Sequence, residues 1–347
     1  MKTIKQFIML AFILSAFSLM AQNKVALHSN GVSSFFNGAT PFSSAYSAAV
    51  DGDTIYLPGG TFAAPAQINK RVVIYGVGHH PDSSAVLGET IISGSFAIYP
   101  AASKSHFEGL KLTSGSFTYN GITDSVVIKR CYFTSLNFNN YASVGTQILE
   151  NFINGNIAGT GSINTEIAYN VIKKSTTNVL SNFANQAWIH NNVIIGVGNY
   201  ISYSHTFMFN SISDCLFDNN VIFNEGNHVN NVVSSSVANN TFLNNVFNGT
   251  PDLALNTGQN NYYGIVTSTV FTNYTGLTVS YLEDLHLISP TTYVGTTGNE
   301  VGIYGGFSPA KLGAIPVNPH FQFKNIATAT NANGDLQIQI QVEAQNE

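Results

Sequence analysis

Two pairs of side chains that could do acid–base or ion-binding chemistry occupy equivalent places in a repeated six-residue pattern. His190 and Asp218 each follow the first apolar residue of one copy, and Lys129, with Arg130 beside it, has the same place in an earlier copy. If the copies stack, Asp218 lies next to His190 and can hold its imidazole in one tautomer as a general acid or base. Lys129 and Arg130 could neutralise a uronic acid carboxylate while a base removes the neighbouring proton.

Both pairs also have purely structural interpretations. Glu150 falls one copy after Arg130, so these residues can form a cross-strand ion pair, which contributes less than about 1 kcal/mol when it is exposed. A surface hydrogen bond is the corresponding interpretation of His190 and Asp218. Neither pair is specific to one reaction, and the sequence leaves both interpretations open.

The pattern itself reads apolar, any, any, Asn, any, apolar. It occurs in "ILENFI" at 148–153, "IAYNVI" at 167–172, "IHNNVI" at 189–194, "FDNNVI" at 217–222 and "VANNTF" at 237–242, with weaker copies before and after. Its fourth position holds, in order, Leu110, Cys131, Asn151, Asn170, Asn192, Asn220, Asn240 and Asn261. A period near twenty residues is too short for helix-pair repeats and suits one turn of a β-solenoid.

Stacked turns explain why asparagine recurs among apolar residues. In a solenoid each strand pairs with its equivalent about 4.8 Å away, so one repeat position becomes a column. An asparagine at a corner can adopt the left-handed backbone conformation, and its amide can bond to the asparagines above and below. The sequence therefore predicts a structural ladder of asparagines. Exposed Asn-rich loops are the alternative, but such loops would not keep apolar residues at fixed places around each asparagine.

At this point the chain resembles the right-handed parallel β-helix proteins of the pectin-lyase-like superfamily. The resemblance covers about residues 40 to 310 and includes "PFSSAYSAAVDGDTIYLPGGTF", which indicates a capping helix over 41–50 followed by a first strand. We therefore expect an all-β chain whose right-handed parallel β-helix occupies 23–312, with a short N-terminal capping helix. A resemblance of this kind identifies a fold rather than a reaction.

The resemblance implies a secreted protein that acts on extracellular polysaccharide as a lyase or a glycosidase. "AWIHNN" at 187–192 is similar to the Trp-Ile-Asp-His run of pectate lyases, but His190 stands where that family has aspartate and Asn191 where it has histidine. The arginine-rich catalytic segment of that family is missing. The alternative is a non-catalytic surface protein, an adhesin or a structural β-solenoid.

A longer spacing between two copies predicts a loop that leaves the solenoid. The segment 196–214 carries about eight extra residues, and such insertions often form binding surfaces. Its aromatic and polar side chains suit stacking on sugar rings, and two polar residues follow in the next turn. The candidate substrate-binding residues are Tyr200, Tyr203, His205, Glu225 and His228. Packing of the longer turn is the structural alternative.

The two ends of the chain differ from the repeats. Residues 1–21 have early lysines, an apolar run and a small residue at Ala21, which indicates a signal peptide and export to the outside of the cell or its surface. Residues 313–347 contain an Asn-Gly turn followed by strict alternation of apolar and polar residues. This alternation predicts a strand with one buried face, as a strand or hairpin that caps the last coil. The alternative is a secretion or docking tail.

Composition excludes several other functions. Only 9% of residues are charged and the net charge is -5, so nucleic acid would find no positive track. We expect no membrane span after signal cleavage, no metal site, no cofactor and a monomer. The two cysteines, Cys131 and Cys215, fall four repeats apart, beyond the reach of a disulfide, and should be buried free thiols.

Overall fold

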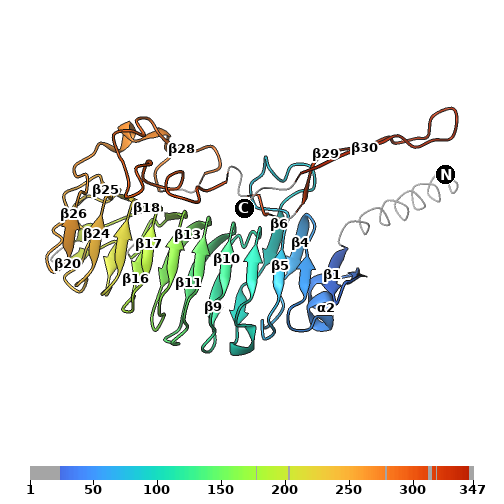
Figure 1. The fold of residues 1–347 in the computed structure, drawn as a ribbon, viewed down its shortest axis with the longest axis horizontal. Helices are drawn as coiled ribbons and strands as arrows, with labels where there is room; N and C mark the ends of the chain where they lie inside the picture. The colour runs from blue at the N-terminus through green and yellow to red at the C-terminus, as the bar shows by residue number, and fades with distance from the viewer. Residues whose placement is uncertain are drawn as a thin grey trace, which may run out of the picture.

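The chain winds into an elongated parallel β-helix whose N-terminal coils lie at one end and whose later coils lie at the other (Figure 1). The computed structural model describes residues 24–343 except 177, 202–203, 278–279, 312–314 and 318. The expected signal peptide at 1–21 lies outside the described residues. Within the described part of the chain, no helix is both long and apolar enough to span a bilayer.

Sheet A forms one long side of the helix. Most of its short strands bury a central apolar residue, such as Ile148, Ile167 or Ile189, and turn the two flanking residues toward the outer face. From β3 onward the neighbours are parallel. In spatial order the strands are β2 (Val32–Phe36), β1 (Val25–Ser29), β3 (Thr54–Tyr56), β5 (Val73–Tyr75), β8 (His106–Glu108), β10 (Val127–Lys129), β12 (Gln147–Leu149), β14 (Glu166–Ala168), β17 (Trp188–His190), β22 (Leu216–Asp218), β24 (Thr241–Leu243) and β26 (Thr257–Gln259).

Sheet B follows sheet A around a tight corner in each coil. Its main path contains β25 (Val246–Phe247), β23 (Val221–Asn224), β18 (Val193–Gly196), β15 (Val171–Lys173), β13 (Phe152–Ala158), β11 (Tyr132–Asn137), β9 (Ser116–Tyr119) and β7 (Phe96–Ile98). Shorter pairs complete the coils, namely β16 (Leu180–Ser181) with β21 (Phe209–Asn210) and β4 (Gly60–Ala63) with β6 (Thr90–Ser93). The 3-10 turns η2 (Pro100–Ala102) and η3 (Thr267–Thr269) lie in connecting segments.

The asparagine ladder lies inside the corner between the two sheets. Asn170 donates through Nδ2 to Asn192 Oδ1 at 3.0 Å and to the Ile148 carbonyl at 2.8 Å, while its backbone N–H donates to the same Asn192 oxygen at 2.9 Å. Each amide is thereby satisfied without water, which explains why buried asparagine is tolerated. The continuous ladder is Asn151, Asn170, Asn192, Asn220, Asn245 and Asn261.

Two details of the predicted ladder were wrong. Asn240 belongs to a second, shorter ladder, in which it accepts from the Cys215 N–H and donates to Asn256, and Asn245 takes the predicted place in the main ladder. The left-handed residue is also not the ladder asparagine but the residue before it. The corner residues with positive φ are Arg130, Glu150, Tyr169, Asn191, Asn219, Asn244 and Asn260. The preceding residue turns the chain, and the asparagine then points inward.

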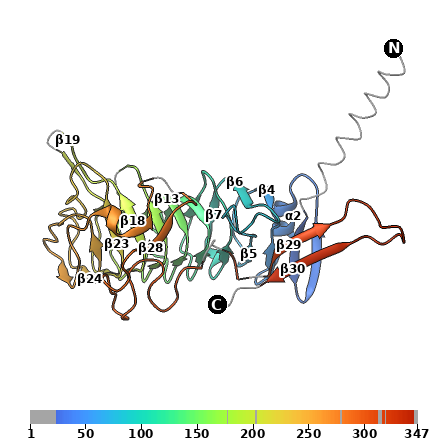
Figure 2. The ribbon, with the colours of Figure 1, turned by 90° about the horizontal axis from the view of Figure 1, so that it is seen from above.

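The N-terminal and inserted elements mostly agree with expectation. Helix α2 (Pro41–Ala48) buries Phe42 against Phe96 at the first coils, as a capping helix should. The antiparallel pair β1–β2 before it was not predicted. The insertion forms the hairpin β19 (Asn199–Ile201) and β20 (Ser204–Thr206), which projects from the body (Figure 2). Cys131 and Cys215 are buried and free, as predicted.

The outer face of sheet B is covered by a later part of the same chain. Val193, Val221 and Phe223 pack beneath this cover segment, residues 265–277 and 280–304, which contains β27 (Phe271–Asn273) and β28 (Asp284–Leu287). Buried Lys173 forms an ion pair with Glu283 of the cover segment. In Figure 1 the cover segment lies along the upper edge of the later coils.

The chain then runs back toward the N-terminal coils. Residues 306–311 and 315–317, the C-terminal strap, contact Tyr169, Glu150 and Glu108 in turn. The antiparallel hairpin β29 (His320–Ile326) and β30 (Ile338–Glu343) is present as predicted, but it lies at the end opposite the last coil (Figure 1). All of β30 is exposed, so the expected buried face is wrong. Because the strap runs back along the solenoid, the hairpin lies far from the last coil, which the hairpin was expected to cover.

Candidate functional site

Three neighbouring strands of sheet A present a cluster of polar and aromatic side chains. Strands β14, β17 and β22 pair in parallel, with Glu166 opposite Trp188 and His190 opposite Asp218. The central residue of each strand points into the core, so these four side chains are on the outer face. The predicted adjacency of His190 and Asp218 is therefore confirmed.

The contacts of His190 differ from those expected. Its Nε2 lies 3.2 Å from Glu166 Oε1 on the preceding strand, and its Nδ1 lies 3.2 Å from Asn191 Oδ1. Asp218 instead accepts hydrogen bonds from Trp188 Nε1 at 2.6 Å and from the Asn219 amide at 3.0 Å. The carboxylate that can orient the imidazole is Glu166, which the sequence interpretation did not include.

Trp188 is the largest exposed side chain of this cluster. Its ring stacks on the His190 ring, with the centroids 3.8 Å apart and the planes at 22°, and 44% of its surface is exposed. The stack covers one face of the imidazole, and Nε1 bonds to Asp218. The sequence carried a signal for this role, because Trp188 is the only tryptophan and stands at an outward position of the repeat.

The two carboxyl groups experience opposite shifts of pKa. The hydrogen bond from His190 is the main reason why the pKa of Glu166 is lowered. Burial raises the pKa of Asp218, although the bond from Trp188 and the nearby His190 act in the other direction. Two carboxyl groups whose pKa values are shifted in opposite directions are typical of the general acid and the ionised partner of catalytic sites.

A cleft of about 250 Å³ lies over this cluster and is closed on one side by the C-terminal part of the chain. Trp188 and His190 line its sheet side, and Thr296 and Phe307 line the opposite side. Thr296 is held in place by two hydrogen bonds with the Asn219 side chain, at 2.8 and 2.9 Å. Residues far apart in sequence thus form one concave site with apolar and polar walls, as ligand sites commonly have.

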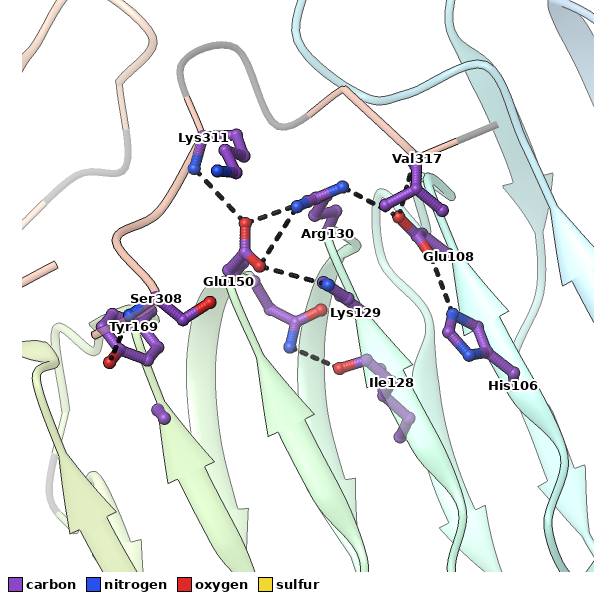
Figure 3. Close-up of polar contacts among 12 residues, drawn as sticks. His106, Glu108, Ile128, Lys129, Arg130, Glu150, Tyr169, Ser308, Lys311 and Val317 are labelled. Atoms are coloured by element: carbon purple, nitrogen blue, oxygen red, sulfur yellow. Dashed lines mark hydrogen bonds and ion pairs between the residues drawn. The ribbon is translucent and has the colours of Figure 1, made fainter. Parts of the chain in front are cut away.

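The predicted cation pair is not open to a ligand. Arg130 is almost completely buried, with Nε 2.9 Å from Glu150 Oε2 and Nη1 3.2 Å from Glu108 Oε1 (Figure 3). Lys129 lies 3.4 Å from Glu150, and the strap covers this group by donating the Lys311 N–H to the same carboxylate. The predicted contact between Arg130 and Glu150 is present, but it is a buried network rather than an exposed pair.

The candidates near the insertion do not join the Trp188 cluster. His205 lines a separate small cavity beside the inserted hairpin. Glu225 accepts a hydrogen bond from Tyr274 of the cover segment at 2.7 Å, and the His228 carbonyl accepts one from Asn224. Tyr200 lies in β19, but its side chain and the whole of Tyr203 are outside the described residues.

Among the described residues, no group of three or more His, Cys, Asp or Glu side chains is placed to hold a metal ion. The Trp188 cluster presents an imidazole with carboxyl groups on the two neighbouring strands, beside an aromatic ring. Comparison with models of protein families and with curated proteins finds no match to this chain.

Proposed function

We propose that this chain is an exported β-helix protein that binds an extracellular polysaccharide at the Trp188 cleft. The observation that carries the proposal is the Trp188 ring, which lies half-exposed over His190 with Asp218 and Glu166 around it. A flat aromatic face can pack against the apolar side of a sugar ring, and carboxylates and imidazoles at its edge can bond to sugar hydroxyls.

A second candidate function is hydrolysis of the bound glycan. The raised pKa of Asp218 favours it as a proton donor, and the lowered pKa of Glu166 favours it as the ionised carboxylate. A β-eliminating lyase is less well supported, because Lys129 and Arg130 already bond to Glu150 and are not free to neutralise a substrate carboxylate. Binding without reaction, as in an adhesin, remains the non-catalytic form of the same proposal.

The binding proposal is tested by isothermal titration calorimetry with neutral and uronic acid oligosaccharides. Trp188→Ala should weaken the binding of the best ligand at least about tenfold, while Trp188→Phe should retain most of it, because the ring face is kept. Tyr263→Ala is the matched control, since Tyr263 is an exposed aromatic residue at the far end of the solenoid. Equal loss in the control, or no binding of any glycan, would contradict the proposal.

Hydrolysis is tested separately by following new reducing ends and absorbance at 235 nm with the same ligands. A hydrolase releases reducing ends without new absorbance, and Asp218→Asn and Glu166→Gln should each reduce the rate by at least about a hundredfold. Binding without product identifies the non-catalytic form. New absorbance would identify a lyase and overturn the assignment of Asp218 as proton donor.

Export and superfamily membership belong to the same proposal. The signal sequence at 1–21 and the coil pattern support a secreted, monomeric member of the pectin-lyase-like superfamily. Expression of the full chain with its leader should place a product beginning near Gln22 outside the cytoplasm, and mass spectrometry of that product checks the cleavage. Retention of the leader would contradict export by cleavage.

A further inference from the structure

Phe307 has the highest exposed fraction, 91%, among the large hydrophobic side chains that the structure describes. It lies at the start of the strap and lines the Trp188 cleft on the side opposite Trp188. A ring this exposed gains almost nothing for folding by burial. Its place beside a concave site with converging polar groups instead fits a role in holding a ligand.

Two glycines fix where Phe307 lies. Gly306 has a φ of 74°, and a Cβ at this position would lie 2.7 Å from the Tyr169 hydroxyl. A Cβ at Gly305 would lie 1.6 Å from a backbone carbonyl oxygen. The chain approaches the corner this closely because neither residue has a side chain. The Ser308 N–H then donates to the Tyr169 hydroxyl at 3.3 Å (Figure 3), so the backbone next to Phe307 is held at the rim of the cleft.

The C-terminal part of the chain forms a wall of the cleft along the ladder corner. Corner residues of three successive coils bond to it, namely Tyr169 to Ser308, Asn191 to Gly302 and Asn219 to Thr296. Toward the N-terminal end, the column beside this corner is closed, because Ala168 and Glu108 are fully buried. A ligand in the cleft therefore has no path along that column.

The cleft is short along the axis of the solenoid. Its sheet side comes from β14, β17 and β22, and no residue of β12 or β24, both of which are fully described, lines it. Three strands cover two steps of about 4.8 Å, or about 10 Å. The volume of about 250 Å³ is below the roughly 300–1,000 Å³ of sites for drug-sized ligands, so the cleft has room for about one or two sugar rings.

The charges of the cleft disfavour an acidic sugar. Glu166 and Asp218 both line it, and none of its described lining residues is a lysine or an arginine. The lowered pKa of Glu166 keeps this carboxylate ionised at neutral pH. A uronic acid ring would therefore meet like charge without a compensating cation. The hydroxyls of Thr296 and Ser308 offer neutral donors and acceptors for sugar hydroxyls instead.

We infer that the Trp188 cleft is a pocket for the end of a glycan chain, in which one non-acidic sugar ring is held between the rings of Trp188 and Phe307. The inference rests on the proposed function and adds the part of the glycan that is bound, its charge class and Phe307 as a binding residue. Aromatic rings on opposite sides of a cleft can pack against both faces of a sugar ring. The rest of the glycan leaves toward solvent, on the side away from the corner.

The role of Phe307 is tested by calorimetric titration of cello-, xylo- and mannooligosaccharides of two to eight sugars. Phe307→Ala should weaken the binding of the best series about three- to tenfold at every length, because one of two ring faces is lost. Phe307→Tyr keeps that face and should bind within about twofold of the native chain. Leu282→Ala is the matched control, since Leu282 is 82% exposed and does not line the cleft, and it should bind like the native chain.

The length of the glycan tests the pocket itself. In the native chain, affinity should stop rising at about three sugars, because only the terminal rings are enclosed. The polysaccharide of the same series should bind one protein molecule per chain end of the recognised kind, and the stoichiometry of the titration measures this number. A groove that binds the middle of a chain would instead take up many protein molecules along each polymer.

The outcomes separate this inference from the function on which it rests. Affinity that rises with every added sugar up to eight, or many bound proteins per polymer, would refute the end pocket while glycan binding at Trp188 stands. If Trp188→Ala weakens binding and Phe307→Ala does not, the second ring wall is refuted. Tighter binding of oligogalacturonides than of neutral oligomers would overturn the charge class. Absence of any glycan binding would instead overturn the proposed function. Circular dichroism of each variant shows that the β-helix remains folded.

Discussion

The outer faces of sheets A and B are built from the same repeat but differ in how far the rest of the chain buries them. In sheet B the outward positions are apolar, as at Val193, Val221 and Phe223, and the chain's own cover segment buries them. In sheet A the outward positions are mixed: Glu108 and His190 are buried, whereas Trp188 and Tyr56 are 44% and 38% exposed. The ladder corner therefore divides a face that is buried by apolar packing from a face that stays partly exposed.

The largest effect should come from truncating a side chain on the covered face. Phe223 is fully buried, and its ring lies 5.6 Å from that of Phe271 in the cover segment. Phe223→Ala should lower the free energy of unfolding by about 3–5 kcal/mol, because it leaves a cavity. Leu216→Ala on the open face, where Leu216 is 36% exposed, should cost less than about 1 kcal/mol. Urea unfolding measures both, and equal costs would abolish the distinction between the faces.

The next effect concerns the corner that supports both faces. Asn192→Leu removes the oxygen that accepts both the backbone N–H and the side-chain amide of Asn170, leaving buried donors without partners. We expect a loss of about 3 kcal/mol in urea unfolding. Asn333→Leu, at the exposed turn of the C-terminal hairpin, is the control and should have little effect. A neutral result at Asn192 would mean that the ladder does not stabilise the corner.

A more local effect concerns the strap beside the open face. Burial tends to raise the pKa of Glu108, but bonds from His106 and the Val317 N–H and the charge of Arg130 lower it below its usual value near 4.5. A lowered pKa stabilises the folded form above the usual pKa, and this contribution is lost as the pH falls through the lowered value.

Hydrogen exchange of the strap should therefore accelerate as the pH falls from 5 toward 3, after correction for intrinsic rates. Glu108→Gln should show a weaker pH dependence of this exchange, because its side chain does not titrate. A strap whose protection is the same at pH 6 and pH 3 would show that these carboxylates do not hold it.

The smallest effect on stability is expected at Asp218. Burial raises the pKa of this carboxyl group, so the folded state favours its protonated form. The protonated group therefore contributes to folding stability at low pH, and this contribution is lost as the pH rises through the raised pKa. Asp218→Asn keeps an oxygen for Trp188 Nε1 and should change the free energy of unfolding at pH 7 by less than about 1 kcal/mol. It should also flatten the change of Trp188 fluorescence with pH. A loss above about 2 kcal/mol would indicate that the ionised form is needed for folding.

The repeat predicted the fold well because stacking makes local sequence positions into columns. Asn170, Asn192 and Asn220 and the pairing of His190 with Asp218 follow from that rule alone. The rule failed at Asn240 because two asparagine pairs, 239–240 and 244–245, both fit the pattern within one coil. Only the register of β24 chooses between them.

The site was less predictable because its contacts depend on side-chain directions and on distant segments. Sequence spacing could not distinguish Glu166 from Asp218 as the partner of His190, since both lie one strand away. The burial of Arg130 depends on a strap almost 200 residues further along the chain, which donates to Glu150 and Glu108 from 161 and 209 residues away. No local pattern carries that information.

The most direct test of the open face uses the only tryptophan of the chain as its reporter. Acrylamide should quench the fluorescence of the half-exposed Trp188, and the oligosaccharide that binds best should reduce the quenching constant at least about twofold, because the stacked sugar shields the ring. An unchanged quenching constant under conditions where calorimetry shows binding would place the glycan elsewhere and contradict the account.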